Sequence, residues 1–199
     1  MTAPAQAGGR REEILRIAAQ LIAEEGFDQA TMRLIAKAAG IQPASLYYHF
    51  ATKEDILDEV IRGFLADLPG RYRAIIAAGN PARRTLHDLI ALGFRASLAN
   101  ATVMAIIIHE RKLFARHDRF AYVADTMRAI ERLWLGVLEQ GVAAGEFRRG
   151  LNLPLVLRMI LDLAGSAIEW YRPNNRRHAL DAIIDAQLDF IFHGITDLK

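Results

Sequence analysis

Hydroxyl, imidazole and ammonium groups gather in one short stretch near the N-terminus of the sequence. The stretch contains Ser45, Tyr47, Tyr48, His49 and Lys53. Serine and tyrosine hydroxyls can form hydrogen bonds with phosphate oxygens and with base edges. A lysine in the first turn of a helix lies beside free backbone N–H groups, so the two together can hold one phosphate. These residue types are suited to nucleic-acid contacts rather than to bond-making chemistry.

Two short helices, expected over residues 31–39 and 42–49, would position these side chains. Gly40 lies in the turn between them, and two short helices joined by such a turn form a helix-turn-helix unit. Ala36 is small where the two helices must cross. The apolar residues that would seal the core of the unit are Ile35, Ile41, Leu46 and Phe50. The outer face of the second helix then carries only short or hydrogen-bonding side chains, which suits a helix that lies in a major groove.

Helical signals continue on both sides of this unit. Residues 10–25 have an apolar stripe at helical spacing, and Gly26 is placed to end that helix. Thr52 and Asp55 have the spacing of a capping box, which predicts the start of a helix over residues 53–68. Residues 1–9 are expected to form a flexible tail.

The remainder of the chain predicts further helices and no strands. Gly79, Asn80 and Pro81 break the pattern, Pro69 and Gly70 break or kink it, and Asn80 and Asn152 are candidate caps. The expected helices cover residues 81–98, 100 or 102–113, 117–144, 153–171 and 177–194. The predicted fold is therefore all-α, with nine or ten helices and no internal repeat.

Composition excludes several classes of protein. The chain has 199 residues, no cysteine and a formal net charge of +2, so it has no disulfide framework and no thiolate metal site. Its longest apolar run, residues 103–108, is too short to span a membrane. We expect a protein of the cytoplasm with no membrane partner. Residues 1–60 are net acidic, so a nucleic-acid site would depend on where single residues lie rather than on bulk charge.

No catalytic constellation stands out in the sequence. It contains no H-E-x-x-H motif, no G-x-S-x-G motif and no phosphate-binding glycine loop. His109 and Glu110 are adjacent, but no third group completes an acid–base site. We therefore expect no enzyme activity, no catalytic residue, no metal and no cofactor.

Spacing alone leaves open whether residues 31–53 bind DNA or are a plain packing unit. The segment reads TMRLIAKAAGIQPASLYYHFATK, and it resembles the DNA-binding region of the TetR family of transcriptional repressors. The shared pattern is a Thr, then an Arg and Ile-Ala, an Ala-Gly, and a Leu-Tyr-x-His-Phe followed by Lys-Glu. The resemblance extends without gaps over roughly residues 10–60.

The resemblance implies DNA-contacting roles for the matching residues. Arg33 and the start of the second short helix match base-contacting positions, namely Gln42, Pro43, Ala44 and Ser45. The positions that match phosphate contacts are Thr31, Tyr47, His49 and Lys53. Tyr48 is the other aromatic of its pair, and the sequence leaves it between the domain core and a phosphate. Few of these side chains read bases by paired hydrogen bonds, so thymine methyl contacts and DNA shape are expected to supply much of the specificity.

The resemblance also implies a second helical domain that dimerises and binds a small effector. The expected division is residues 1–52, the tail and helix-turn-helix, and residues 53–199, with residues 53–68 as a connecting helix. The helices near residues 153–171 and 177–194 are apolar beyond the needs of one core, which favours a symmetric four-helix interface between two copies. The other interpretation is that both helices are internal.

The effector site is expected between the middle helices. The candidate lining residues are Phe94, Leu98, Met104, Ile107, His109, Leu113, Phe120, Met127, Ile130, Trp134 and Trp170. Each of them also fits an ordinary core position. The run Trp170-Tyr171-Arg172-Pro173 is similar to one in TetR-family members that respond to acyl-CoA thioesters of fatty-acid or sterol breakdown. An aromatic pair can stack on adenine, while Arg172, Arg176 and Arg177 can hold phosphates.

The sequence as a whole predicts a homodimeric repressor. Two copies would bind the half-sites of a palindromic double-stranded DNA operator, and a small hydrophobic effector, such as an acyl-CoA, would release them. The alternative is a helical ligand-binding protein with no DNA role.

Overall fold

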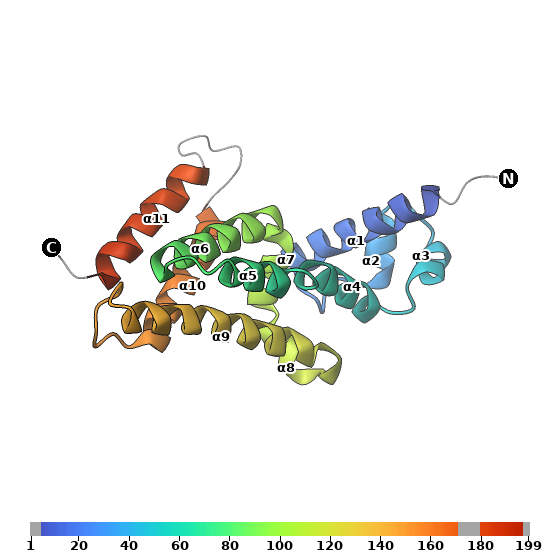
Figure 1. The fold of residues 1–199 in the computed structure, drawn as a ribbon. Coiled ribbons are helices and arrows are strands. Elements are labelled where there is room, and N and C mark those ends of the chain that lie inside the picture. The colour runs from blue at the N-terminus through green and yellow to red at the C-terminus, as the bar shows by residue number, and fades with distance from the viewer. Residues whose placement is uncertain (1–4, 171–179, 197–199) are drawn as a thin grey trace. The chain divides into compact units, whose positions relative to one another are not determined.

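The structure is a computed structural model that describes residues 5–170 and 180–196. Within those residues every regular element is helical, which confirms the all-α class (Figure 1). Contacts between Cα atoms divide the chain into two compact units, one from residues 1–66 and 100–124 and the other from residues 67–99 and 125–199. The division expected between residues 52 and 53 concerns function, with DNA binding before it and effector binding and dimerisation after it. It does not coincide with the boundary of the compact units, and it stays a prediction.

The first unit contains the helix-turn-helix. Its elements are α1 (Ala5–Glu25), α2 (Met32–Ala38), α3 (Pro43–His49), α4 (Lys53–Leu65), α7 (Ala101–His109), α8 (Arg111–Arg116) and the 3-10 turn η1 (Asp118–Phe120). The expected core residues Ile35, Ala36, Leu46 and Phe50 are buried together with Ile14 of α1. Ile41 is partly buried and packs against that cluster. The predicted core of the helix-turn-helix is therefore confirmed.

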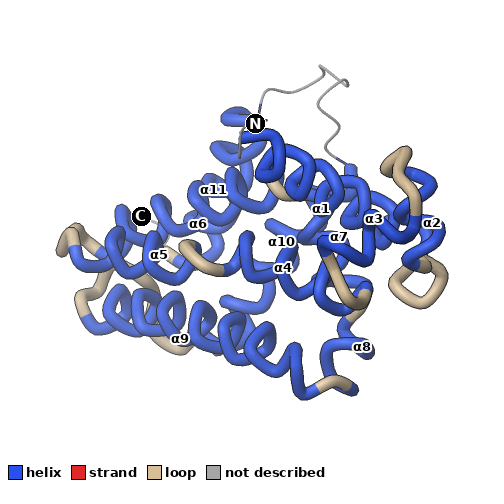
Figure 2. The backbone as a smooth tube through the Cα atoms, turned by 90° about the vertical axis from the view of Figure 1, so that its right-hand side faces the viewer, coloured by secondary structure: helices blue, strands red, loops and turns tan. Residues whose placement is uncertain are grey.

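The second unit is built around α6 (Ala82–Ala99). This helix contacts α5 (Leu68–Ala77), α10 (Leu153–Trp170) and α11 (Leu180–Ile195). The long helix α9 (Ala121–Ala143) begins in the first unit and continues in the second. In both views α5 lies between α6 and α9 (Figures 1 and 2). The buried side chains of α6 include Leu86, Leu89, Ile90 and Phe94, so this helix supplies much of the core of the second unit.

Capping residues explain where several helices begin. Thr31 Oγ1 accepts a hydrogen bond from Leu34 N at the start of α2, and Thr52 and Asp55 form the predicted capping box of α4. Asn152 Oδ1 accepts from Leu155 N at the start of α10, as predicted. Gly26 ends α1 with a φ of +85°, a conformation that favours glycine.

Other helix ends differ from the prediction. The α1 helix begins at Ala5 rather than Arg10, because Ala5-Gln6-Ala7 favours helix and the following glycines only weaken it. The helix predicted over residues 53–68 ends at Leu65, and Pro69 lies in the first turn of α5, where its missing N–H is harmless. The helix predicted to reach residue 113 is interrupted at Glu110, between α7 and α8.

The start of α6 is capped by a residue distant in sequence. Its first N–H groups, those of Ala82 and Arg83, donate to the two carboxylate oxygens of Glu146 at 3.0 and 2.9 Å. The side chain of Asn80, the predicted cap, is not their partner. Glu146 lies just after α9, where the ring of Phe147 occupies the space beside Gly141, and a Cβ at Gly141 would lie only 2.1 Å from that ring. The loop after α9 is therefore folded tightly enough to place a carboxylate at the start of α6.

No single helix among the described residues is long and apolar enough to cross a membrane. Among the described residues, the consecutive helices α6 and α7 reach the length and apolar composition of a membrane span only when they are counted as one segment across the bend between them.

Candidate nucleic-acid interface

The α3 helix separates its residues into a buried side and an exposed side. Leu46 is fully buried, while Gln42, Pro43, Ala44, Ser45, Tyr47 and Tyr48 are exposed and His49 is partly buried. Tyr47 is 55% exposed and Tyr48 is 87% exposed, so the core alternative for Tyr48 is wrong. Both phenol hydroxyls of the pair are therefore available to a partner outside the chain.

The α2 helix contributes a cap and a cation. Thr31 is exposed and holds the N-terminus of α2 through Leu34 N. Arg33 is exposed and makes no hydrogen bond or ion pair with any described residue. A guanidinium in this state is ready to pair with a phosphate or a base edge without first breaking an internal contact.

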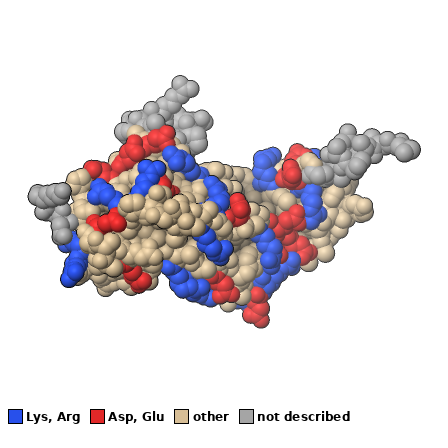
Figure 3. Space-filling view, viewed as in Figure 1, with Lys and Arg blue, Asp and Glu red and all other residues tan. Residues whose placement is uncertain are grey.

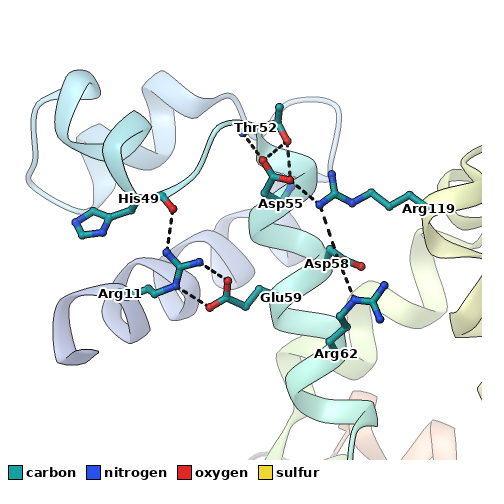
Figure 4. A network of polar contacts seen from close by, with 8 residues as sticks. All are labelled: Arg11, His49, Thr52, Asp55, Asp58, Glu59, Arg62 and Arg119. Atoms are coloured by element: carbon teal, nitrogen blue, oxygen red, sulfur yellow. Dashed lines mark hydrogen bonds and ion pairs between the residues drawn. The ribbon is translucent and has the colours of Figure 1, made fainter. Parts of the chain in front are cut away.

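Arg11 of α1 holds the end of α3 in place (Figure 4). Its Nη1 donates to the carbonyl oxygen of His49 at 2.9 Å, and its Nε and Nη2 donate to the two carboxylate oxygens of Glu59 on α4 at 2.9 and 2.5 Å. The guanidinium also lies 4.1 Å from the centroid of the Phe50 ring. One side chain thus joins the last turn of α3 to α1 and α4.

Lys53 contacts the turn that precedes α2. Its Nζ donates to the carbonyl oxygens of Phe27 and Asp28 at 2.6 and 3.3 Å, and it lies over the Phe27 ring. Glu110 holds the same turn, because its Oε1 accepts from Phe27 N at 2.8 Å. Two of the three donors of the ammonium therefore serve the fold, and one is left for the phosphate contact that the sequence predicts.

Asp55 at the start of α4 has two partners. Its carboxylate accepts from Thr52 N and Oγ1 within the capping box, and its other oxygen pairs with Arg119 at 2.5 Å. The hydrogen bond from Arg119, followed by that from Thr52, lowers the pKa of Asp55 below its ordinary value. Arg119 also lies 3.9 Å from Asp58 of α4.

These polar groups surround a cleft in the first unit. The cleft has a volume of 640 Å³ and its lining includes Arg11, Phe50, Asp55, Glu59 and Arg119. Its lining contains three arginines and three acidic residues, and on the face drawn in Figure 3 Lys and Arg are interspersed with Asp and Glu. This mixture of acidic and basic residues fits the expectation that DNA contacts depend on the positions of single residues rather than on bulk charge. Among the described residues no group of three or more His, Asp or Glu side chains is arranged to hold a metal ion.

The sequence did not indicate the contacts of Arg11, Glu110 and Arg119. Each contact joins residues that are 38 to 83 positions apart, so no local spacing reports it. Charged residues on amphipathic helices usually form a solvated face, and only the packing of the helices shows which charges meet.

The predicted effector residues fall in both units. In the second unit Phe94, Ile130 and Trp134 are buried, and Leu98 and Met127 are partly buried. In the first unit Ile107 and Phe120 are buried, Met104 and Leu113 are partly buried, and His109 is exposed. Phe120 packs edge-on against Phe114 at 5.5 Å between ring centroids. The side chain of Trp170, and Arg172, Arg176 and Arg177, lie outside the described residues.

Tyr72 is a buried aromatic residue that the sequence did not indicate. It is 4% exposed, and its ring meets Trp134 edge-on at 5.5 Å between centroids. Because Pro69 and Gly70 break or kink the pattern, the sequence did not define the helix that contains Tyr72. A single tyrosine there did not indicate a buried position beside Trp134.

Comparison with known proteins places this geometry in a family. The family model described as "Bacterial regulatory proteins, tetR family" matches residues 14–60, which contain the helix-turn-helix. A second model, "Tetracyclin repressor-like, C-terminal domain", matches residues 79–195. Together the two models span most of the described helices.

Individual relatives agree with the models. The HTH-type transcriptional repressor KstR2 of Rhodococcus jostii is 41% identical to this chain over 188 residues, which cover 94% of this chain and 92% of the relative. The solved structure of the ketosteroid transcriptional regulator KstR2 of Mycobacterium tuberculosis has a TM-score of 0.89 at 36% identity, over 95% of this chain and 96% of that chain.

A more distant solved structure shares the fold. AibR, in complex with isovaleryl coenzyme A and operator DNA, has a TM-score of 0.78 at 19% identity, over 92% of this chain and 98% of that chain. The two family models and the KstR2 relatives show that the chain belongs to the TetR family of bacterial transcriptional regulators.

Proposed function

We propose that the chain is a homodimeric repressor that binds a palindromic operator through α3 and is released by a small hydrophobic effector. The observation that carries the proposal is the exposed face of α3. The side chains of Ser45, Tyr47 and Tyr48 are exposed on this face, while the core of the helix-turn-helix is buried. The relatives that match over nearly the whole chain are named transcriptional repressors. On this proposal residues 1–52 form the DNA-binding domain, Lys53 at the start of α4 adds a phosphate contact, and residues 53–199 respond to the effector and dimerise.

The dimer is proposed to form through α10 and α11. Leu155 and Met159 are 54% and 64% exposed one turn apart on α10, and Phe190 on α11 is 74% exposed. Large apolar side chains at such exposure favour burial against a second copy. A two-fold dimer would place its two α3 helices in successive major grooves, about one helical turn apart.

The effector is proposed to be an acyl-CoA thioester from lipid or sterol breakdown. Three observations support this class: the sequence Trp170-Tyr171-Arg172-Pro173, the nearby Arg176 and Arg177, and the relatives. One relative is named a ketosteroid regulator, and AibR was solved with a coenzyme A thioester and operator DNA. Aromatic stacking on adenine and arginine pairing with phosphates would recognise the coenzyme part.

The effector would act by shifting a population of dimers. A ligand that binds better to one arrangement of the helices favours that arrangement, and a dimer whose α3 helices no longer match the half-site spacing leaves the operator. The α4 helix is the proposed carrier of the change, because it follows α3 directly and its capping box holds Arg119.

A binding assay with operator DNA tests the proposal. Labelled DNA from upstream of the chain's own gene is titrated with the protein, with and without isovaleryl-CoA, longer acyl-CoA thioesters and the matching free acids. We expect binding without ligand and release by at least one thioester but not by its free acid. Release only by free acids would refute the acyl-CoA class, while thioester binding with no DNA binding would favour a ligand-binding protein without a DNA role.

A further inference from the structure

We propose that Glu110 is a positioning residue for operator binding, because it fixes the turn at Phe27 and thereby holds the ammonium of Lys53 ready for a DNA phosphate. The inference rests on the proposed function, which gives Lys53 a phosphate contact, and it adds the residue that fixes this contact in place. In the sequence Glu110 stands beside His109 as half of an incomplete acid–base pair. The contacts of its carboxylate support a different role.

The backbone of Glu110 is fixed at the corner between two helices. It is the residue at which α7 ends and α8 begins. Its N–H donates to Ile106 O of α7 at 2.9 Å, and its carbonyl oxygen accepts from Phe114 N of α8 at 3.1 Å. The side chain of Glu110 therefore starts from a point that hydrogen bonds hold on both sides.

The carboxylate of Glu110 reaches the turn between α1 and α2. Its Oε1 accepts from Phe27 N at 2.8 Å. Gly26 precedes this N–H with a φ of +85°, and a Cβ at Gly26 would lie 3.5 Å from the same oxygen, so the carboxylate packs closely against the backbone of the turn. The Phe27 side chain is 3% exposed. Both the backbone N–H and the ring of Phe27 are thus held within the first unit.

Lys53 binds the carbonyl side of the same turn. Its Nζ donates to Phe27 O at 2.6 Å and to Asp28 O at 3.3 Å, and it lies 4.1 Å from the centroid of the Phe27 ring. Two carbonyl oxygens and one aromatic face therefore fix an ammonium that sits at the end of a flexible four-carbon stem. Because these groups all belong to Phe27 and Asp28, the position of the ammonium follows the position of the turn.

An ammonium held in this way suits a phosphate contact better than a free one. A lysine side chain loses much rotamer freedom when it is fixed, and a side chain that is fixed before DNA binds loses less of it on binding. The third donor of the ammonium is left for the phosphate. Without the Glu110 carboxylate the turn loses one of its contacts, and the ammonium of Lys53 loses its fixed position.

The charge of Glu110 predicts the opposite effect on DNA binding. A carboxylate on a protein that binds DNA repels the phosphates, so its removal should strengthen binding. A positioning role predicts that removal weakens binding. The sign of the change in operator affinity therefore distinguishes the two effects.

Three substitutions of Glu110 separate its contact from its charge. Glu110→Gln keeps an oxygen acceptor at the same reach and removes the charge. Glu110→Asp keeps the charge but shortens the side chain by one carbon, and Glu110→Ala removes both. The matched control is Glu24→Ala, which removes a carboxylate that is bonded to Gln20 within α1, outside the turn.

Operator affinity is measured by fluorescence anisotropy over a series of salt concentrations. The DNA is the labelled segment from upstream of the chain's own gene, and the protein is the full chain. Circular dichroism gives the melting temperature of each variant. Glu110→Asp is the milder change and carries the test if Glu110→Ala does not fold.

We expect Glu110→Ala and Glu110→Asp to weaken operator binding about tenfold. Both should also reduce the slope of log affinity against log salt by about 0.9, the value for one lost phosphate contact. Glu110→Gln and Glu24→Ala should bind at least as tightly as the unchanged chain, with the same slope. Glu110→Ala combined with Lys53→Ala should be no weaker than Lys53→Ala alone, because both changes remove one contact.

Several results would overturn the positioning role. If Glu110→Ala and Glu110→Asp kept the affinity and the slope of the unchanged chain, the carboxylate would serve only the fold, even if the melting temperature fell. If the losses of Glu110→Ala and Lys53→Ala added in the double variant, the two residues would act separately. An unchanged slope in Lys53→Ala would remove the phosphate contact on which the inference rests. Failure of the unchanged chain to bind the DNA would instead refute the proposed function itself.

Discussion

Single residues of α3 divide into those that hold the fold and those that are free to contact a partner. Leu46 is fully buried and Tyr47 and Tyr48 are exposed, so neighbouring positions should respond in opposite ways to truncation. We expect Tyr47→Ala and Tyr48→Ala to weaken operator binding with little change in the free energy of unfolding. Leu46→Ala should lower that free energy by roughly 2–5 kcal/mol. Urea unfolding and fluorescence anisotropy with labelled operator separate the two effects.

The two tyrosine variants also have an outcome that would contradict the assignment. If either variant lost several kcal/mol of stability, the exposed phenol would have a structural role that its 55% or 87% exposure does not suggest. If both bound operator like the unchanged chain, the exposed aromatic pair would not be part of the DNA surface.

Arg33 and Lys53 are both predicted to contact DNA, but they differ in their internal contacts. Arg33 has no partner among the described residues, while Lys53 holds the carbonyl oxygens of Phe27 and Asp28. Arg33→Ala should reduce the slope of log affinity against log salt by about 0.9, the value for one lost phosphate contact, or relax base preference, with no change in stability. Lys53→Ala should weaken operator binding and also lower the melting temperature.

A comparison with Lys53→Arg sharpens this prediction. Arginine keeps the charge but not the compact ammonium that fits between two carbonyl oxygens and the Phe27 ring. Operator affinity retained with a lowered melting temperature would identify the internal contact. A melting temperature unchanged in both Lys53 variants would show that the contact to the turn contributes nothing measurable.

At the scale of elements, the sequence predicted helices whose ends depend on local chemistry. Thr31, the Thr52–Asp55 capping box, Asn152 and Gly26 act within a few residues of the helix ends that they define. The Glu146 carboxylate that caps α6 acts across 63 residues, and Glu110 holds Phe27 N across 83. Periodicity reports which face of a helix is apolar, but it does not report which distant charge reaches a helix end.

The same limit applied to the candidate site. Residues of α3 were predicted because their types and spacing lie within one helix and resemble a known pattern. Arg11 gave no such signal, although it holds the carbonyl of His49 and the carboxylate of Glu59 together. Its role follows from the packing of three helices.

Arg11 is therefore expected to position α3 without contacting DNA itself. Arg11→Ala should weaken operator binding about tenfold and lower the free energy of unfolding by about 1 kcal/mol, a modest figure because both side chains are more than a third exposed. Glu59→Ala should have a similar effect, and the double variant should be no worse than either single one. Additive losses of operator affinity would show that the two residues act separately.

Asp55 gives the first unit a predictable response to acid. Arg119 and Thr52 lower its pKa in the folded chain, so its contribution to stability is complete above the ordinary value of 3.8 and is lost as the pH falls through the folded value. Asp55→Asn should lower stability at pH 7 and flatten the pH dependence below about pH 4. Urea unfolding between pH 2 and 7 measures this, with Asp28→Asn, an exposed change, as the control. If Asp55→Asn left the pH dependence of the free energy of unfolding at acid pH unchanged, other carboxylates would account for that dependence.

At the scale of the whole molecule, the proposed recognition of the operator requires two copies of the chain held at a fixed spacing. The apolar residues Leu155, Met159 and Phe190 are exposed on helices that otherwise build the second unit, so a charge there should disfavour pairing while leaving each copy folded. We expect Met159→Glu and Phe190→Glu to shift the chain from dimer to monomer in analytical ultracentrifugation. Arg148→Glu, an exposed loop change after α9, should leave the dimer intact.

Operator binding by these variants distinguishes two roles of the apolar face. If the face holds the dimer, Met159→Glu and Phe190→Glu should lose affinity for the full palindrome far more than for a single half-site, because only the pairing of α3 helices is removed. Helical content measured by circular dichroism should stay unchanged. Monomers that still bound the palindrome as tightly as the unchanged chain would refute the two-copy arrangement. Dimers that persisted in both variants would place the interface on another surface.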